Sequence, residues 1–354
     1  MWWQVSENFP SLSLVPKTDD KQSAKDFKSD QEVRWCPGCG DYAILAAVQG
    51  FMPEPGVKRE NIVFVSGIGC SSRFPYYMNT YGLHSIHGRA PAIATGLATS
   101  RPDLSVWVVT GDGDALSIGG NHLIHALRRN VNLKILLFNN RIYGLTKGQY
   151  SPTSPLGKIT KSSPVGSLDH PFNPLSVAIG AEATFVARTV DSDRAHLQSV
   201  LRAAAAHEGT ALIEIYQNCD IFNDGAFEPM KNADSRDDVT IRLEHGEKII
   251  FGANKDRCVI RNKDGQLVVA QVSEVDEAQI IVHDAHLDDP TYAFGLTRIS
   301  HPETLQDTPI GVLRDIKRPS YDRLMREQLD QVIAKDGPGD LAKLILGKDT
   351  WEVN

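Results

Sequence analysis

The sequence predicts an α/β fold with a doubly wound, mainly parallel sheet and a C-terminal extension. Up to about residue 220, short apolar segments rich in β-branched residues alternate with segments of helical periodicity. Residues 104–140 show strand, Gly/Asp turn, helix and strand in succession, which is a βαβ unit with its right-handed crossover. From about residue 240 the segments are shorter and indicate antiparallel strands.

The individual elements follow from the same periodicities. In order along the chain, we expect a helix over 41–51, a buried strand over 61–67, a helix over 89–100, the βαβ unit, a strand over 183–189, a helix through 193–207 that begins near a possible N-cap at Asp191, and a strand over 210–217. Residues 247–274 should form short antiparallel strands around a Lys-Asp-Gly turn, and residues 321–335 a charged helix.

The chain is long enough for one large domain and a smaller part. We expect an N-terminal arm over residues 1–34, a main domain over 35–225, and a C-terminal extension with short strands and a helix over 226–354.

Composition and charge exclude several classes of function. The net charge of −7 gives no basic surface for nucleic acid. No apolar run reaches the roughly 18 residues of a membrane-spanning helix, and the N-terminus lacks the charged and apolar regions of a secretory signal. We therefore expect a cytoplasmic protein that binds neither nucleic acid nor membrane.

Two polar motifs follow the two strands of the βαβ unit. The first is Gly111-Asp112-Gly113-Asp114, and the second is Asn139-Asn140. Ligands of open α/β sheets bind outside these strand ends, and Mg²⁺ prefers carboxylate and amide oxygens together with phosphate and water. The glycines would let the backbone approach a diphosphate. An acidic turn and an asparagine pair without a ligand are the alternative, but the spacing favours a magnesium diphosphate site.

The cysteines raise a second question. Cys36 and Cys39 are spaced as in half a zinc site, a redox disulfide, or two ligands of an iron–sulfur cluster. Cys70 and Cys219 stand alone, each following an expected strand, so the same sheet edge could bring all four together. Four thiolates suit either Zn²⁺ or an iron–sulfur cluster, and ligand identity does not choose between them. We expect Cys258 to be an ordinary buried thiol.

The motifs together resemble a known family. The segments "WCPGCGDYAI", "GIGCSSRFPYY", "HSIHGRAPAIATGLA", "VVTGDGDALSIGGNH" and "FNNRIYGLTKGQYSPTS" are similar to those of the β subunit of 2-oxoacid:ferredoxin oxidoreductases, over about residues 33–225. The resemblance implies the thiamine diphosphate (ThDP) fold, in its diphosphate-binding form. It also implies ThDP- and Mg²⁺-dependent oxidative decarboxylation of a 2-oxoacid, with coenzyme A as acyl acceptor and ferredoxin as electron acceptor. The same groups would serve the reverse, reductive carboxylation.

The resemblance also implies roles for individual residues. It assigns Asp112, Asn140 and the Ile142 carbonyl to Mg²⁺, and His87 and Arg89 to catalysis beside the cofactor. One 4Fe–4S cluster would be held by Cys36, Cys39, Cys70 and Cys219. The residues expected to contact the cofactor are Cys70, Ser71, Gly111, Asp112, Gly113, Asp114, Asn140, Ile142, Tyr143, Gly144 and Leu145.

Substrate and partner follow from the same resemblance. Arg73 and Lys147 lie in loops that would face the substrate, and cations there would pair with a second carboxylate. We therefore expect 2-oxoglutarate, with pyruvate as the alternative. The chain carries the diphosphate motif only, so an α subunit should bring the pyrimidine half of the ThDP site, most simply in an α2β2 assembly. The competing hypotheses are a non-redox ThDP carboligase or decarboxylase with structural zinc, and a non-catalytic assembly subunit.

Overall fold

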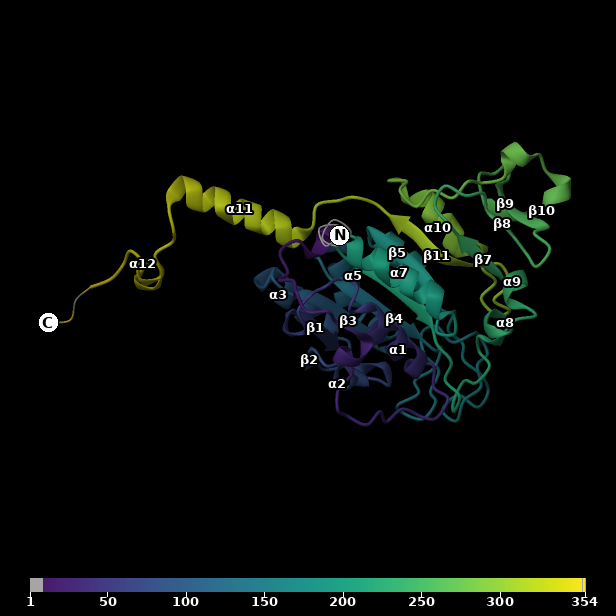
Figure 1. Cartoon of the computed structure of the whole chain (residues 1–354), viewed down its shortest axis with the longest axis horizontal. Helices are drawn as coiled ribbons and strands as arrows, with labels where there is room; N and C mark the ends of the chain where they lie inside the picture. Colours follow the sequence, from purple (N-terminus) through teal and green to yellow (C-terminus); the bar gives the residue numbers. More distant parts are fainter. Residues whose placement is uncertain (1–8, 352, 354) are drawn as a thin grey trace.

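An eight-stranded sheet runs through the body of the molecule (Figure 1). The computed structural model describes residues 9–351 and 353. The strand order is β2-β1-β3-β4-β6-β5-β11-β7, and every neighbouring pair is parallel except β11 and β5. The strands are β1 (Ile62–Ser66), β2 (Tyr81–His84), β3 (Ser105–Gly111), β4 (Lys134–Asn139), β5 (Phe185–Val190), β6 (Ala211–Tyr216), β7 (Thr240–Leu243) and β11 (Thr308–Asp315). This confirms the predicted mainly parallel sheet.

Helices cover both faces of the sheet, as the doubly wound prediction requires. One apolar core joins the sheet to α1 (Asp41–Phe51) and α7 (Arg194–Ala206). The core on the other face joins it to α3 (Ala90–Ser100), α5 (Gly120–Arg129), α6 (Pro174–Gly180) and α10 (Pro290–Ile299). The shorter helices are α2 (Phe74–Tyr77), α4 (Asp112–Leu116), α8 (Glu228–Lys231) and α9 (Arg236–Val239). Because helices cover both faces, every residue of β4, β5 and β6 is buried. Most of these residues are apolar, and the charged residues Arg188 and Glu214 form an ion pair with each other.

The N-terminal arm lies on the main domain. Residues 1–8 of the predicted arm are outside the described residues. Phe9, Leu12 and Phe27 are buried in the same core as α1 and α7. The Asn132 side-chain amide donates to the Ser11 carbonyl at 2.8 Å, which ties the arm to the start of β4.

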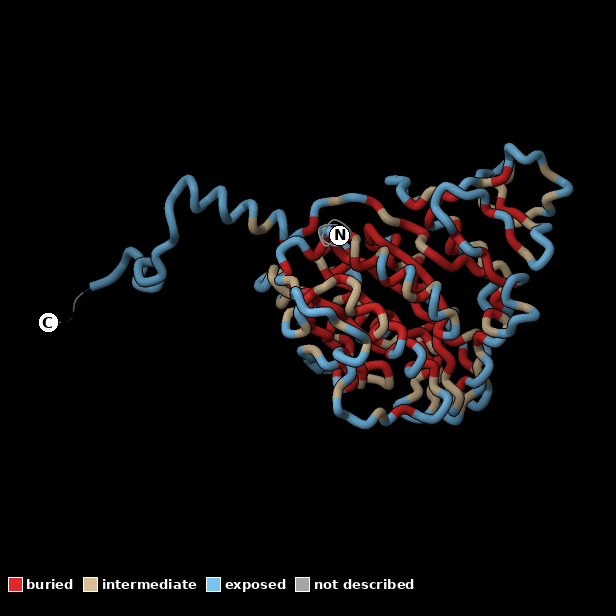
Figure 2. The backbone as a smooth tube through the Cα atoms, in the orientation of Figure 1, coloured by how far each residue is buried: buried red, intermediate tan, exposed pale blue. Residues whose placement is uncertain are grey.

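The C-terminal extension contributes to the central sheet as well as adding to its surface. Strands β7 and β11 belong to the eight-stranded sheet, and β11 lies between β5 and β7. A second sheet contains β8 (Ile250–Phe251), β9 (Arg257–Arg261) and β10 (Leu267–Gln271), and its antiparallel pairing confirms the predicted turn at residues 263–265. Helices α11 (Tyr321–Asp336) and α12 (Leu341–Leu346) extend away from the body, and almost all of their surface is exposed (Figures 1 and 2).

One predicted helix start is wrong by two residues. The N-cap of α7 is Asp193, whose carboxylate accepts the His196 N–H at 3.0 Å. Asp191 is buried, and its carboxylate accepts the Asn218 N–H at 3.0 Å instead. Both residues are aspartates, so the sequence pattern did not distinguish them. In the part of the chain that the structure describes, no helix has the length and apolarity needed to cross a membrane.

Candidate active site

Two neighbouring strand ends form a cavity of about 110 Å³. β3 and β4 are parallel neighbours, with Gly111 paired to Phe138, so the residues that follow both strands meet at one edge of the sheet. The predicted magnesium ligands Asp112, Asn140 and Ile142 line this cavity. So do all the other residues expected to contact the cofactor, which are Cys70, Ser71, Gly111, Gly113, Asp114, Tyr143, Gly144 and Leu145.

Asp112 is buried and held by two hydroxyl groups. Ser151 Oγ and Thr153 Oγ1 both donate to Asp112 Oδ2, and neither contacts Oδ1. Burial raises the pKa of the Asp112 carboxyl, while these two hydrogen bonds lower it. A buried carboxylate oxygen beside the Asn140 amide and the Ile142 backbone is the kind of hard-oxygen donor set that Mg²⁺ takes.

The walls of the cavity fit a diphosphate. A Cβ on Gly113 would lie 2.1 Å from the Tyr143 ring, so only glycine leaves the ring in place. The Tyr143 hydroxyl donates to the Gly113 carbonyl at 3.0 Å. Ser71 Oγ is buried and has no hydrogen-bond partner among the described residues. A phosphate oxygen would satisfy this hydroxyl, whose burial is otherwise costly.

Asp114 holds the two loops that flank the cavity. Its Oδ1 accepts the backbone N–H groups of Ile68 at 3.1 Å and Gly88 at 2.7 Å, and it also contacts His87 Nδ1. Its Oδ2 accepts the Thr110 hydroxyl at 2.7 Å. The carboxylate therefore positions the cavity walls, a role that the motif alone did not reveal.

The two predicted catalytic residues have different positions. His87 lines the cavity, and because Nδ1 faces Asp114, Nε2 is the ring nitrogen left for a ligand. Arg89 does not line the cavity; its guanidinium donates to the carbonyls of His87 at 3.3 Å and Ile118 at 3.2 Å. The structure therefore brings His87 to the cofactor cavity. Arg89 lies outside the cavity lining and connects the loop of His87 to the loop of Ile118 through hydrogen bonds.

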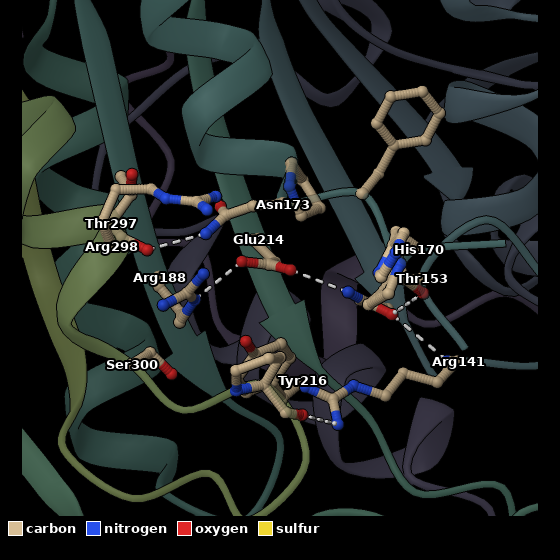
Figure 3. A pocket seen from close by; sticks show the side chains of 15 residues that line it. Arg141, Thr153, His170, Asn173, Arg188, Glu214, Tyr216, Thr297, Arg298 and Ser300 are labelled. Carbon is tan, nitrogen blue, oxygen red and sulfur yellow. Dashed lines mark hydrogen bonds and ion pairs between the residues drawn. The ribbon is translucent and has the colours of Figure 1, made fainter. Parts of the chain in front are cut away.

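The two asparagines at the end of β4, Asn139 in the strand and Asn140 just after it, have different surroundings. Asn140 lines the diphosphate cavity. The Asn139 amide donates to Glu214 Oε1 at 2.7 Å. Glu214 Oε2 accepts Arg188 Nε at 2.7 Å (Figure 3). Thr153 Oγ1, which contacts Asp112, lies 2.9 Å from Asn139 Oδ1. Successive strand residues point to opposite sides, which explains why one motif serves two places.

The four cysteines line a second cavity, of about 210 Å³. A Cβ on Gly144 would lie 3.5 Å from both Cys70 Sγ and Cys219 Sγ, so the Gly144 backbone lies directly against these two sulfurs. Among the described residues, no group of three or more His, Cys, Asp or Glu side chains is arranged so that it could hold a metal ion. Four cysteines around one cavity are a donor set that either zinc or an iron–sulfur cluster takes.

Three of the four thiols, those of Cys39, Cys70 and Cys219, are partly buried. Burial raises the pKa of Cys70 to about 12, and it raises the pKa of Cys39 and Cys219 as well. Thiols in this state release protons when they bind metal. The Gln217 amide donates to Cys39 Sγ at 3.3 Å, and hydrogen bonds to sulfur are one of the factors that set a cluster's potential.

Comparison with known proteins identifies the family. Residues 67–215 match the family described as thiamine pyrophosphate enzyme, C-terminal TPP binding domain. The chain is 63% identical to the 2-oxoglutarate oxidoreductase subunit KorB of Mycobacterium tuberculosis, over 98% of this chain and 93% of that protein. The chain belongs to the β subunits of 2-oxoacid:ferredoxin oxidoreductases.

Other proteins of this family are also similar to the chain in sequence and in structure. The 2-oxoglutarate synthase subunit KorB of Methanocaldococcus jannaschii is 36% identical, over 70% of this chain and 89% of that protein. Among solved structures, the 2-oxoglutarate:ferredoxin oxidoreductase of Magnetococcus marinus, with 2-oxoglutarate, coenzyme A and succinyl-CoA bound, superposes with a TM-score of 0.74. It is 32% identical and covers 94% of this chain and 99% of that one.

The cations predicted to bind substrate lie together in this β subunit, but not in the diphosphate cavity. Arg73 and Lys147 both line the cysteine cavity, as does Arg34. Lys147 has a positive φ of 74°, in the left-handed region that is costly for a residue with a Cβ. Both predicted substrate cations therefore lie on the cysteine cavity, and neither lines the diphosphate cavity.

Sequence reasoning missed several residues of the site. Ser151 and Thr153 lie in an irregular segment without periodicity, although they follow the second motif closely. Trp35, whose Nε1 donates to the Cys70 carbonyl at 2.7 Å, immediately precedes the cysteine pair. Gln217 directly follows β6 and precedes Cys219 closely. Proximity to a motif is the only signal that could have found them.

Proposed function

We propose that this β subunit takes part in the ThDP- and Mg²⁺-dependent, coenzyme A-linked oxidative decarboxylation of 2-oxoglutarate. One 4Fe–4S cluster on Cys36, Cys39, Cys70 and Cys219 passes the electrons to ferredoxin. The observation that carries the proposal is that the two cavities share a wall, formed by Cys70, Asn140, Gly144 and Leu145. Electrons that leave a 2-oxoacid at the first cavity have a one-electron acceptor directly beside it.

The chain's own residues hold the reactants in this scheme. Asp112, Asn140 and the Ile142 carbonyl hold Mg²⁺, and the Ser71 hydroxyl donates to the diphosphate. When bound, ThDP would supply an electron sink for the electron pair that a 2-oxoacid leaves behind as it loses CO₂. His87, oriented through Nδ1 by Asp114, presents Nε2 to the reacting end of the cavity, where it can accept or donate a proton.

A dicarboxylate substrate fits the charge beside the shared wall. Arg73 and Lys147 can pair with the distal carboxylate of 2-oxoglutarate, which pyruvate lacks. Steady-state rates with the two acids test this, using the complex of the chain with its α subunit. We expect 2-oxoglutarate to be preferred, and Arg73→Ala and Lys147→Ala to raise its KM more than that of pyruvate. Equal rates with both acids would point to pyruvate or to a broad-specificity enzyme.

The proposed α subunit has an exposed surface to cover. Ile86 and Ile118 flank the loop of His87 and are 71% and 51% exposed. Exposed apolar side chains this close to His87 in the chain or in space are the kind of surface that a partner subunit covers. We expect the chain alone to show no turnover, and activity to appear with the α subunit in an α2β2 assembly. Robust turnover by the isolated chain would refute this arrangement.

Metal analysis separates the proposal from its competitors. Protein purified without oxygen should be brown and contain four irons per chain, with matching sulfide. A colourless protein with one zinc per chain would support the non-redox carboligase instead. Failure to bind ThDP, with or without the α subunit, would leave only an assembly role. The predicted cytoplasmic location stays a prediction.

A further inference from the structure

A third cavity, larger than the two already described, lies beside Asn139, near the metal site. Its volume is about 400 Å³, and it lies between the ends of β4, β5 and β6 and the segments at 170–174 and 297–302 (Figure 3). It shares none of its lining with the diphosphate or cysteine cavities. The proposed reaction makes no use of it.

The lining carries an excess of positive charge. Three guanidinium groups, those of Arg141, Arg188 and Arg298, face one carboxylate, that of Glu214, which leaves a surplus of two positive charges. Glu214 does not oppose an incoming anion strongly, because both of its oxygens already accept hydrogen bonds, from Asn139 and Arg188. The imidazole of His170 also lies on the lining.

The floor of this cavity has a buried donor without a partner. Arg141 is only 7% exposed, and its Nε has no hydrogen-bond partner among the described residues. Its guanidinium lies 5.6 Å from the centre of the Tyr216 ring, and that of Arg188 lies 5.0 Å from the same centre. The aromatic ring thus lies beside two guanidinium groups. Arg141 Nη1 already donates to the Pro302 carbonyl, and Arg188 donates to Glu214 and to the Pro309 carbonyl, while the remaining N–H groups of both side chains can donate to a carboxylate or phosphate.

Arg298 lies at the opening of the cavity, in the last turn of α10. It is exposed, and within the described residues its guanidinium makes no hydrogen bond or ion pair. Phe172 lies beside the opening and is 52% exposed. The rim therefore offers one uncommitted cation above two buried ones.

We propose that this cavity is a binding site for a small anion with at least two negative charges, carried on carboxylate or phosphate groups. Arg141 and Arg188 form the floor that receives one anionic group, and Arg298 closes on the other. The volume admits a small metabolite, and the inference does not depend on which 2-oxoacid the enzyme uses.

Calorimetric titration of the assembled complex, loaded with ThDP and Mg²⁺ at low ionic strength, tests the proposal. Tricarballylate probes the carboxylate class and inorganic phosphate the phosphate class. We expect one of them to bind once per chain, and Arg298→Gln to weaken that binding by about tenfold, because a charge-assisted hydrogen bond is lost. Arg298 is exposed and has no side-chain partner among the described residues, so the variant should fold.

Arg129→Gln is the matched control. Arg129 is also exposed and also lies in the last turn of a helix, α5, but far from this lining in the sequence and absent from it. Its replacement should change the affinity by less than about twofold. Absence of binding by both anions would overturn the proposal. Binding that Arg298→Gln leaves unchanged, or that both variants weaken equally, would overturn it too.

Discussion

Replacing Asp114 by alanine should loosen both loops of the diphosphate cavity. In the wild type the carboxylate accepts hydrogen bonds from Ile68, Gly88 and Thr110 and contacts His87. Hydrogen bonds to a charged group contribute about 1.5–3 kcal/mol each. The sum is reduced because water can enter beside the half-exposed His87 ring, so we expect a loss of about 3–5 kcal/mol in the free energy of unfolding.

The matched variant is Asp114→Asn. Its side-chain oxygen can still accept the N–H groups of Ile68 and Gly88, and the Thr110 hydroxyl can rotate to accept from the new amide. We expect this variant to lose only about 1 kcal/mol. Urea unfolding measures the difference, and hydrogen exchange at the two amides shows where it arises. If both amides exchange as slowly in Asp114→Ala as in the wild type, Asp114 does not hold the loops.

Three further predictions concern other parts of the chain. Thr153→Val removes a hydrogen bond that lowers the pKa of Asp112, so this pKa should rise further. Because a protonated Asp112 is no longer a metal ligand, the Mg²⁺-dependent affinity for ThDP should fall by about tenfold, and by more at about pH 6 than at about pH 8. Titration with ThDP at both pH values checks the sign. Gly144→Ala should fold normally, because the added Cβ makes only 3.5 Å contacts with Cys70 Sγ and Cys219 Sγ. The methyl group would lie against both of these cluster ligands, so the variant should retain less than about half of the iron. Full iron content would contradict the placement of the cluster. Burial, and then the charge of Arg242, lower the pKa of His196 to about 4. The unfolded chain therefore binds a proton before the folded one as the pH falls, and the free energy of unfolding should fall by up to about 3 kcal/mol between about pH 6.5 and pH 4. In urea titrations, His196→Gln should show a smaller change with pH.

Sequence could predict those residues of the site whose positions follow directly from regular secondary structure. Asp112 and Asn140 follow adjacent parallel strands, and the geometry of a βαβ unit brings such positions together. The positions of Cys70 and Cys219 were predictable for the same reason, because each follows a strand of the same sheet.

The parts that escaped prediction depend on irregular segments and long-range pairing. Ser151 and Thr153 reach Asp112 from a loop whose path no periodicity encodes. The role of Asp114 required knowing that two distant loops converge on it. Strand β11 could be recognised as apolar, but its antiparallel place beside β5 depends on a pairing between distant parts of the chain.

The place of β11 has a consequence for synthesis of the protein. Gly311 pairs with Arg188 on one side and with Leu243 on the other, so this late segment lies inside the sheet. Until the ribosome has released it, β5 presents an unpaired apolar edge on which other chains can add. A chain cut at the apparent end of its cofactor domain would carry that open edge permanently, and we would expect it to aggregate although both cofactor motifs were intact.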